Sequence, residues 1–157
     1  KVFSSLRVRI KEVGSPFVHF KGRTKSNSFY AFQRLAAFGL VEYERVILID
    51  VDMHVVDDLS MLFQMQLRPL QLVVEADYLM CSRVQPVPFD ALREAGDELH
   101  KYGKGFSMGV VAFNPSEQLL ELVRAASTNA SAAMNDQHVV YDLVATGQMP
   151  MPVVMGY

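Results

Sequence analysis

Two aspartates, Asp50 and Asp52, stand one residue apart directly after four apolar residues, 46–49. Side chains alternate along a strand, so both carboxylates are expected on one side while Val51 between them stays packed. Two unpaired carboxylates so close together repel each other and suffer from desolvation, and a divalent cation relieves both effects. The cation would also attract a diphosphate. The pair therefore predicts a cation site that holds a diphosphate; the alternative is a pair of solvent-exposed turn carboxylates.

His54 continues the same alternation and could be a third ligand of the cation. If the chain turns after Met53, however, the strand register is lost and His54 becomes an ordinary loop or partly buried residue. We favour this second interpretation, because the sequence MHVVDD is typical of a chain leaving a strand.

The elements around the pair must carry it to an edge of a sheet. Apolar residues at helical spacing predict a helix over 26–40, with Asn27 or Ser26 as its cap, and the run RVILID at 45–50 predicts a strand covered on both faces. This order indicates an α/β fold with a largely parallel sheet, in which ligands bind outside the carboxyl ends of the strands.

The rest of the chain continues the α/β pattern. The sequence predicts strands within 6–13, 70–76, 106–116 and 149–157, helices at 57–63, 117–128 and 135–147, and an irregular excursion over 77–105 with a helical turn near 90–95. Asp57 or Asp58 is expected to cap the first of these helices and Ser116 the second, and Gly147 to end the third.

Composition excludes several classes of protein. The 157 residues are half hydrophobic, enough for one domain with a core, and 15 basic against 17 acidic residues leave no broad positive face for nucleic acid. The lone Cys81 forms no internal disulfide and favours a reducing compartment, whereas the sequon at Asn129 favours the secretory route. No apolar run approaches the roughly 18 residues that cross a bilayer.

Three blocks of the chain resemble glycosyltransferase family 8, the glycogenin-like enzymes. From about Ser26 to Phe63, the sequence FYAFQRLAAFGLVEYERVILIDVDMHVVDDLSMLF is similar to the family's basic helix, apolar strand, Asp-x-Asp motif and short helix. Further along, FSMGVVAFNPS resembles the family's Phe-Asn-Ser-Gly-Val strand, and NDQHVV resembles its Asp-Gln helix start. The blocks stand in the family's order.

The resemblance implies a GT-A fold with a Rossmann-like, mostly parallel sheet flanked by helices. It further implies a retaining transferase that moves a hexose-type sugar from a UDP-sugar to an unknown glycan, protein or small-molecule acceptor and uses Mn²⁺ or Mg²⁺. Since the family's first βα unit and C-terminal segment have no counterpart, 1–157 is expected to be one partial catalytic domain, poorly active by itself.

The resemblance also assigns roles around the donor. Asp50 and Asp52 would bind the metal, with the Val51 backbone against the ribose. Arg34 falls where the family has a lysine near the donor, and Lys25 where it often has another basic residue. The third metal ligand, a histidine, would lie beyond the end of the chain.

The sugar would be held by the other two blocks. Ser107, Met108 and Gly109 take the places of the Asn-Ser-Gly that lines it, while Asp136 and Gln137 contact it from the far side as the catalytic pair. The change from Asn-Ser to Ser-Met, together with Ala133 in place of an acidic residue, removes polar contacts to the usual sugar. For Asp136 the alternative is a helix cap, and for Arg34 a solvated charge.

Two other functions remain open. An apolar strand before Asp-x-Asp also occurs in haloacid-dehalogenase-like phosphatases, but their motif continues Gly-Thr, whereas here it continues Met-His. A degenerate transferase without activity would have the same fold. A homodimer is left open, as is the compartment, either cytoplasm or the Golgi lumen if an anchor precedes this chain.

Overall fold

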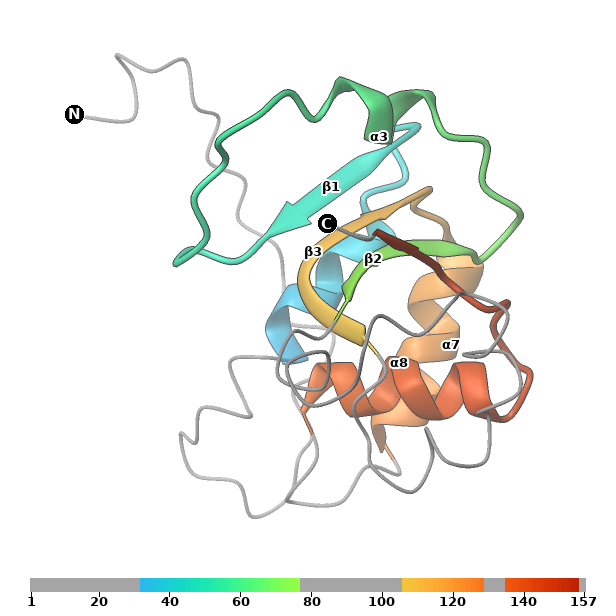
Figure 1. Cartoon of the computed structure of the whole chain (residues 1–157). Coiled ribbons are helices and arrows are strands. Elements are labelled where there is room, and N and C mark those ends of the chain that lie inside the picture. Colours follow the sequence, from blue (N-terminus) through green and yellow to red (C-terminus); the bar gives the residue numbers. More distant parts are fainter. Residues whose placement is uncertain (1–31, 77–105, 129–134, 156–157) are drawn as a thin grey trace, which may run out of the picture.

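The computed structural model describes residues 32–76, 106–128 and 135–155, and Figure 1 shows them as a sheet between helices. The strands are β1 (Val46–Ile49), β2 (Leu72–Ala76), β3 (Phe106–Phe113) and β4 (Val153–Met155), and the helices are η1 (Arg34–Gly39), α3 (Ser60–Gln64), α7 (Glu117–Thr128) and α8 (Asp136–Ala145). Four of the predictions lie outside the described residues: the 6–13 strand, the start of the 26–40 helix with its cap, the role of Lys25 and the 77–105 excursion.

The sheet is mixed, which corrects the expectation of a largely parallel one. Its strand order is β1-β3-β2-β4. Strands β1, β2 and β4 share one direction, but β3 lies between β1 and β2 and is antiparallel to both. An apolar run shows that a strand is covered on both faces and does not show its direction, so the sequence could not reveal this. Because β3 is reversed, the end of β1 lies beside the middle of β3, where Ile49 pairs with Val110 and the Asp50 amide bonds to the Gly109 carbonyl.

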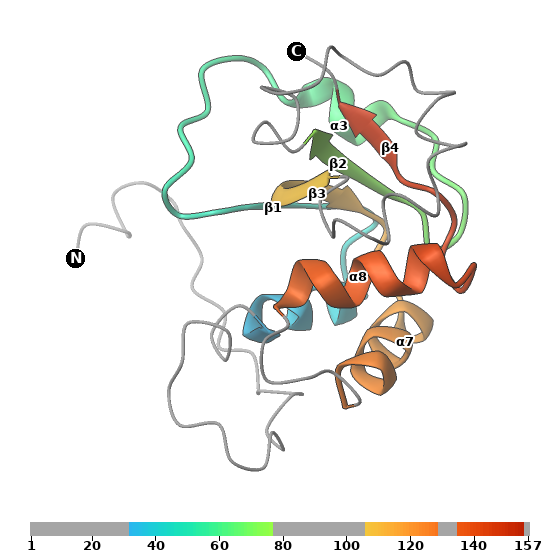
Figure 2. The same cartoon turned by 60° about the horizontal axis from the view of Figure 1, so that its bottom comes forward.

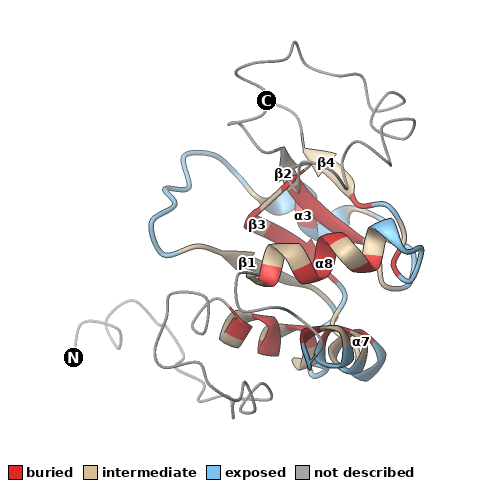
Figure 3. Cartoon of the chain, turned by 90° about the horizontal axis from the view of Figure 1, so that it is seen from below, coloured by how far each residue is buried: buried red, intermediate tan, exposed pale blue. Residues whose placement is uncertain are grey.

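Helices cover both faces of this sheet (Figure 2). On one face η1, α7 and α8 enclose the larger core, in which Phe38 packs edge-on against Phe113 with ring centroids 4.5 Å apart. On the other face α3 covers a smaller cluster with Leu62, Val73 and Ala112 at its centre. Buried residues accordingly line the helices and strands on their facing sides, while the connection from β1 to α3 is exposed (Figure 3).

The first helix is confirmed but is tighter than the sequence predicted. Residues Arg34–Gly39 form a 3-10 helix, not an α-helix. Phe32, Leu35 and Phe38 stand three residues apart and are all fully buried. A 3-10 helix aligns residues at a spacing of three, so this winding places Leu35 and Phe38, the two that lie within it, on the core.

The helix caps agree in part with the sequence. The Ser116 hydroxyl accepts a hydrogen bond from the Leu119 amide at 3.0 Å, as expected, and Gly147 takes a positive φ of 71° after the last helix. In contrast, α3 begins later than expected, at Ser60. The Asp58 carboxylate accepts bonds from the Ser60 amide and hydroxyl in the turn before this helix, so neither Asp57 nor Asp58 is its N-cap.

None of the helices in the described ranges has the length and apolar character that crossing a membrane requires.

Arg45 ties α3 to the end of β3. Its guanidinium donates to the Leu62 carbonyl at 2.6 Å, the Met65 carbonyl at 2.7 Å and the Asn114 side chain at 2.6 Å. We expect Arg45→Met to lower the free energy of unfolding by about 2 kcal/mol, because two helix-end carbonyls lose a charged donor. Urea denaturation followed by circular dichroism measures this.

The control is Arg68→Met, since Arg68 is exposed and, among the described residues, only its backbone amide and carbonyl take part in hydrogen bonds. This variant should change the free energy of unfolding by less than about 0.5 kcal/mol. Equal losses in the two variants would mean that the side-chain hydrogen bonds of Arg45 do not contribute to the free energy of unfolding.

Candidate active site

The Asp50 to Asp52 segment is a turn and no longer part of the strand. β1 ends at Ile49, and the Met53 amide bonds to the Asp50 carbonyl at 3.0 Å. The expectation that Val51 stays packed is wrong: the residue is fully exposed, because strand alternation stops where the strand stops. Asp52 is also exposed.

His54 lies in the exposed connection after the turn, as the favoured interpretation predicted. The chain turns slightly earlier than expected, at Val51 and Asp52 instead of after Met53. His54 is therefore out of register with the strand, and alternation gives no reason to place it beside Asp50.

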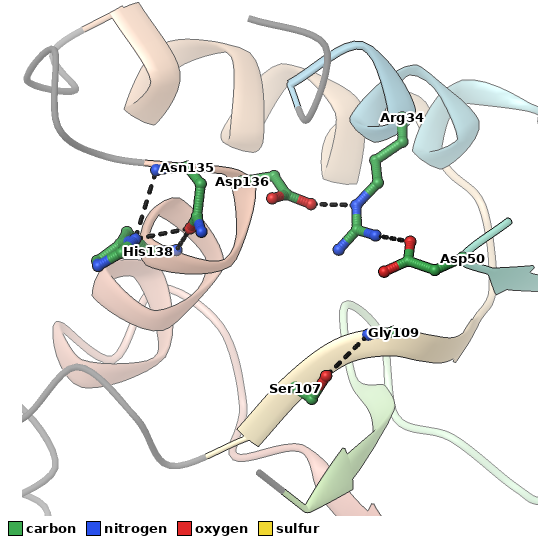
Figure 4. Close-up of polar contacts among 7 residues, drawn as sticks. All are labelled: Arg34, Asp50, Ser107, Gly109, Asn135, Asp136 and His138. Carbon is green, nitrogen blue, oxygen red and sulfur yellow. Dashed lines mark hydrogen bonds and ion pairs between the residues drawn. The ribbon is translucent and has the colours of Figure 1, made fainter. Parts of the chain in front are cut away.

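Asp50 is fixed by its backbone and by its side chain. Its amide donates to the Gly109 carbonyl at 2.9 Å, which continues the β1 to β3 pairing one step beyond the strand. Its carboxylate accepts a hydrogen bond from Arg34 through Oδ1 (Figure 4). These bonds hold the first aspartate in place, while Asp52 extends into solvent.

Arg34 bridges two carboxylates that are far apart in the sequence. Its Nε donates to Asp136 at the start of α8, and one terminal nitrogen donates to Asp50 at the end of β1 (Figure 4). The side chain of Arg34 is only 21% exposed, so it is not the solvated helix charge that was the alternative. Three elements, η1, β1 and α8, thus meet in one charged cluster, Arg34 with Asp50 and Asp136.

Asp136 is almost completely buried, with 4% of its side chain exposed. The alternative that it caps α8 is wrong, because Asn135 is the cap: the Asn135 side chain accepts from the His138 amide at 3.0 Å in a capping box. Asp136 is instead free to face Arg34. Burial raises the pKa of Asp136 above 3.8, and the charge and hydrogen bond of Arg34 offset part of this rise.

This raised pKa makes folding depend on pH. Between 3.8 and the raised pKa, the folded protein binds a proton at Asp136 that the unfolded chain has released, so stability falls as pH rises through this window. Asp136→Asn removes that fall. Urea titrations at a series of pH values measure the free energy of unfolding of both proteins. We expect the wild-type value to fall relative to that of Asp136→Asn from about pH 4 upward. A difference that is constant with pH would contradict the raised pKa.

The predicted sugar-lining residues of β3 face different ways. The Ser107 hydroxyl accepts from the Gly109 amide at 3.0 Å beside the Asp50 cluster (Figure 4). The Met108 side chain, in contrast, is fully buried in the larger core, so only its backbone is left to line a donor site. Alternation along the strand explains the difference.

Sequence reasoning missed Glu75, which belongs to the same edge of the sheet. Glu75 is the next-to-last residue of an apolar strand, much as Asp50 follows one, and this position was a usable signal in the sequence LQLVVEA. It pairs with Ser107 where the β2 to β3 register shifts. A Cβ on Gly109 would stand 3.1 Å from Glu75 Oε2, so the carboxylate lies directly against the glycine.

Two predictions about the site remain, the position of Gln137 and the binding of a metal. Gln137 is half-buried, and its backbone amide donates to the Asp136 carboxylate. Among the residues that the structure describes, no group of three or more His, Cys, Asp or Glu side chains could hold a metal. Two carboxylates, Asp50 and Asp52, still suit a hard cation. Such an ion binds carboxylate oxygens and can take its other ligands from water or phosphate.

Comparison with protein families gives a match over most of the chain. The family model described as glycosyl transferase family 8 matches residues 4–140, which includes the whole charged cluster of Arg34, Asp50 and Asp136. Neither the curated proteins nor the solved structures that were searched gave a match.

Proposed function

Since this chain belongs to glycosyl transferase family 8 and has its GT-A type α/β fold, we propose that it transfers a hexose-type sugar from a UDP-sugar to an acceptor, with retention of configuration and with a divalent cation. The observation that carries the proposal is the cluster in which Arg34 bonds both Asp50 and Asp136. This cluster joins Arg34 and Asp50, which are expected at the diphosphate, to Asp136, which is expected at the sugar.

The chemistry requires positive charge at the diphosphate. When the bond from the anomeric carbon to the phosphate breaks, the leaving UDP gains negative charge, and preorganised positive groups stabilise it. Arg34 is held by two carboxylates, and its second terminal nitrogen has no hydrogen-bond partner among the described residues, so it can donate to a phosphate oxygen (Figure 4). Lys25 would add a second positive charge.

Asp50 and Asp52 would hold Mn²⁺ or Mg²⁺, which would act as a Lewis acid toward the leaving diphosphate. Asp50 uses Oδ1 for Arg34, which leaves Oδ2 for a cation. Asp52 is exposed and within the same turn, so it can turn toward the ion without disturbing the core. The Val51 backbone would lie against the ribose.

The sugar would lie between β3 and α8. Ser107 and Gly109 offer a hydroxyl and a close approach to the backbone, and Asp136 with Gln137 offers oxygen acceptors from the other side. A buried carboxylate can also stabilise the positive charge that develops at the anomeric carbon. Asp136 is suited to this role because Arg34 keeps it in place.

The test is hydrolysis of UDP-hexoses by the intact protein, with Mn²⁺ and with EDTA, followed by release of UDP. We expect turnover that needs the metal and stops with EDTA. Binding of UDP without turnover would support the degenerate transferase instead. A phosphoenzyme trapped by beryllofluoride, with no nucleotide-sugar binding, would support the phosphatase.

A further inference from the structure

The Gly109 position is the closest point between β2, β3 and the aspartate turn. A Cβ there would stand 3.1 Å from Glu75 Oε2, 3.3 Å from Ser107 Oγ and 3.6 Å from Met53 Cε. The Gly109 carbonyl meanwhile accepts from the Asp50 amide at 2.9 Å. Gly109 therefore lies between Glu75 on β2 and Asp50 after β1. The turn that carries Asp52 also reaches Gly109, through the side chain of Met53.

The register shift of β3 creates this arrangement. Val74 pairs with Val111, yet the next residue, Glu75, pairs with Ser107. Of the three residues of β3 between these two pairs, Val110 pairs with Ile49 of β1, and the Gly109 carbonyl accepts from the Asp50 amide. A break of this kind re-aims side chains at the end of a sheet, and here it brings a half-buried carboxylate against a backbone without a side chain.

Glu75 does not share the role of the aspartate pair. Within the described parts of the chain, no three acidic, histidine or cysteine side chains converge, so Glu75 does not complete a metal site with Asp50 and Asp52. Nor is it a partner of Arg34, whose bonds go to Asp50 and Asp136. A half-buried carboxylate beside a serine hydroxyl and an open glycine is suited to accept hydrogen bonds from neutral hydroxyl groups.

We propose that Glu75 is a specificity-determining residue that accepts hydrogen bonds from hydroxyls of the transferred sugar. The proposal rests on the proposed function, since it needs a UDP-hexose in the site. Because Met108 faces the core, position 108 supplies no polar side chain to the sugar, and Glu75 with Ser107 provides the polar wall there. A carboxylate with two oxygens discriminates between sugars by the direction of adjacent hydroxyls, which an apolar wall would not do.

The experiment compares Glu75→Gln and Glu75→Ala with the wild-type protein. Hydrolysis of UDP-glucose, UDP-galactose and UDP-N-acetylglucosamine is measured with Mn²⁺, and binding of UDP alone is measured by calorimetry. For the preferred donor we expect kcat/KM to fall about 30-fold in Glu75→Ala and less in Glu75→Gln, with the ratio between donors moving toward one, since a hydrogen bond to a charged group is lost. UDP binding should stay within about twofold, since the proposed contact of Glu75 is with the sugar, which UDP alone lacks.

The matched control is Glu121→Gln, an exposed glutamate on α7, which should leave every donor unchanged. Unchanged donor ratios and kcat/KM in both Glu75 variants, with an active wild type, would overturn the role of Glu75 and leave the proposed function intact. Equal loss of UDP binding and turnover would also overturn it, because it would mean a structural role. An intact wild-type protein that hydrolyses none of the three donors would refute the proposed function, and with it this inference.

Discussion

Replacing Arg34 with methionine is expected to lower kcat by about a thousandfold and the free energy of unfolding by about 3 kcal/mol. Two losses combine in this variant. The leaving diphosphate loses a preorganised donor, and Asp136, with 4% of its side chain exposed, loses the charge that compensates its burial. The pKa of Asp136 should then rise further, so stability should fall more steeply with pH than in the wild type. Release of UDP and urea denaturation measure the two effects.

Arg34→Lys separates charge from geometry. Lysine keeps the positive charge but cannot donate to both carboxylates from a planar fork, so stability should be partly restored while turnover stays low. Arg124→Met on the exposed face of α7 is the control for removal of an arginine. Wild-type turnover and stability in Arg34→Met would show that the bridge serves neither folding nor catalysis.

A second variant tests whether the stability effect runs through Asp136. In Arg34→Met with Asp136→Asn, no buried charge is left without a partner, so the free energy of unfolding should recover relative to Arg34→Met alone. Turnover should not recover, because the donor to the diphosphate is still missing. Additive losses of stability in the double variant would contradict direct coupling of these two side chains.

Replacing Asp50 with asparagine is expected to reduce metal-dependent turnover by at least about a thousandfold while the fold is retained. Asparagine can still accept from Arg34 through its side-chain oxygen, and the backbone bond to Gly109 does not depend on the side chain. The negative charge that would hold the cation is what disappears. UDP release in a Mn²⁺ titration measures the loss, which excess metal should restore only in part.

Asp57→Asn is the matched control, since Asp57 is an exposed aspartate in the same connection, and within the described parts of the chain its side chain accepts only from the next amide. Its turnover should stay within about twofold of the wild type, as for most surface substitutions. Activity that survives both Asp50→Asn and EDTA would refute the metal-dependent mechanism. Equal losses in the two aspartate variants would point to general disturbance of the loop.

Much of the local structure could be read from periodicity and turn chemistry. The apolar runs at β1, β2 and β3, the Ser116 cap and the glycine after α8 all follow from rules that act within a few residues. The family was also predicted from the order of three motifs, and the match over residues 4–140 confirms it. What failed locally was the end of β1: continued alternation was assumed through Asp52, and Val51 is fully exposed because the chain turns.

The sequence by itself determined the α/β class, the family and the two aspartates after an apolar strand, because these depend on residue types at fixed short spacings. Only the tertiary structure decided which side chains meet. Arg34 and Asp136 are separated by 102 positions, and their bond depends on how η1 and α8 pack on the sheet. The reversed direction of β3 and its register shift place Glu75 and Gly109 beside Asp50. Strand direction and register arise from long-range packing, so no short pattern in the chain contains them.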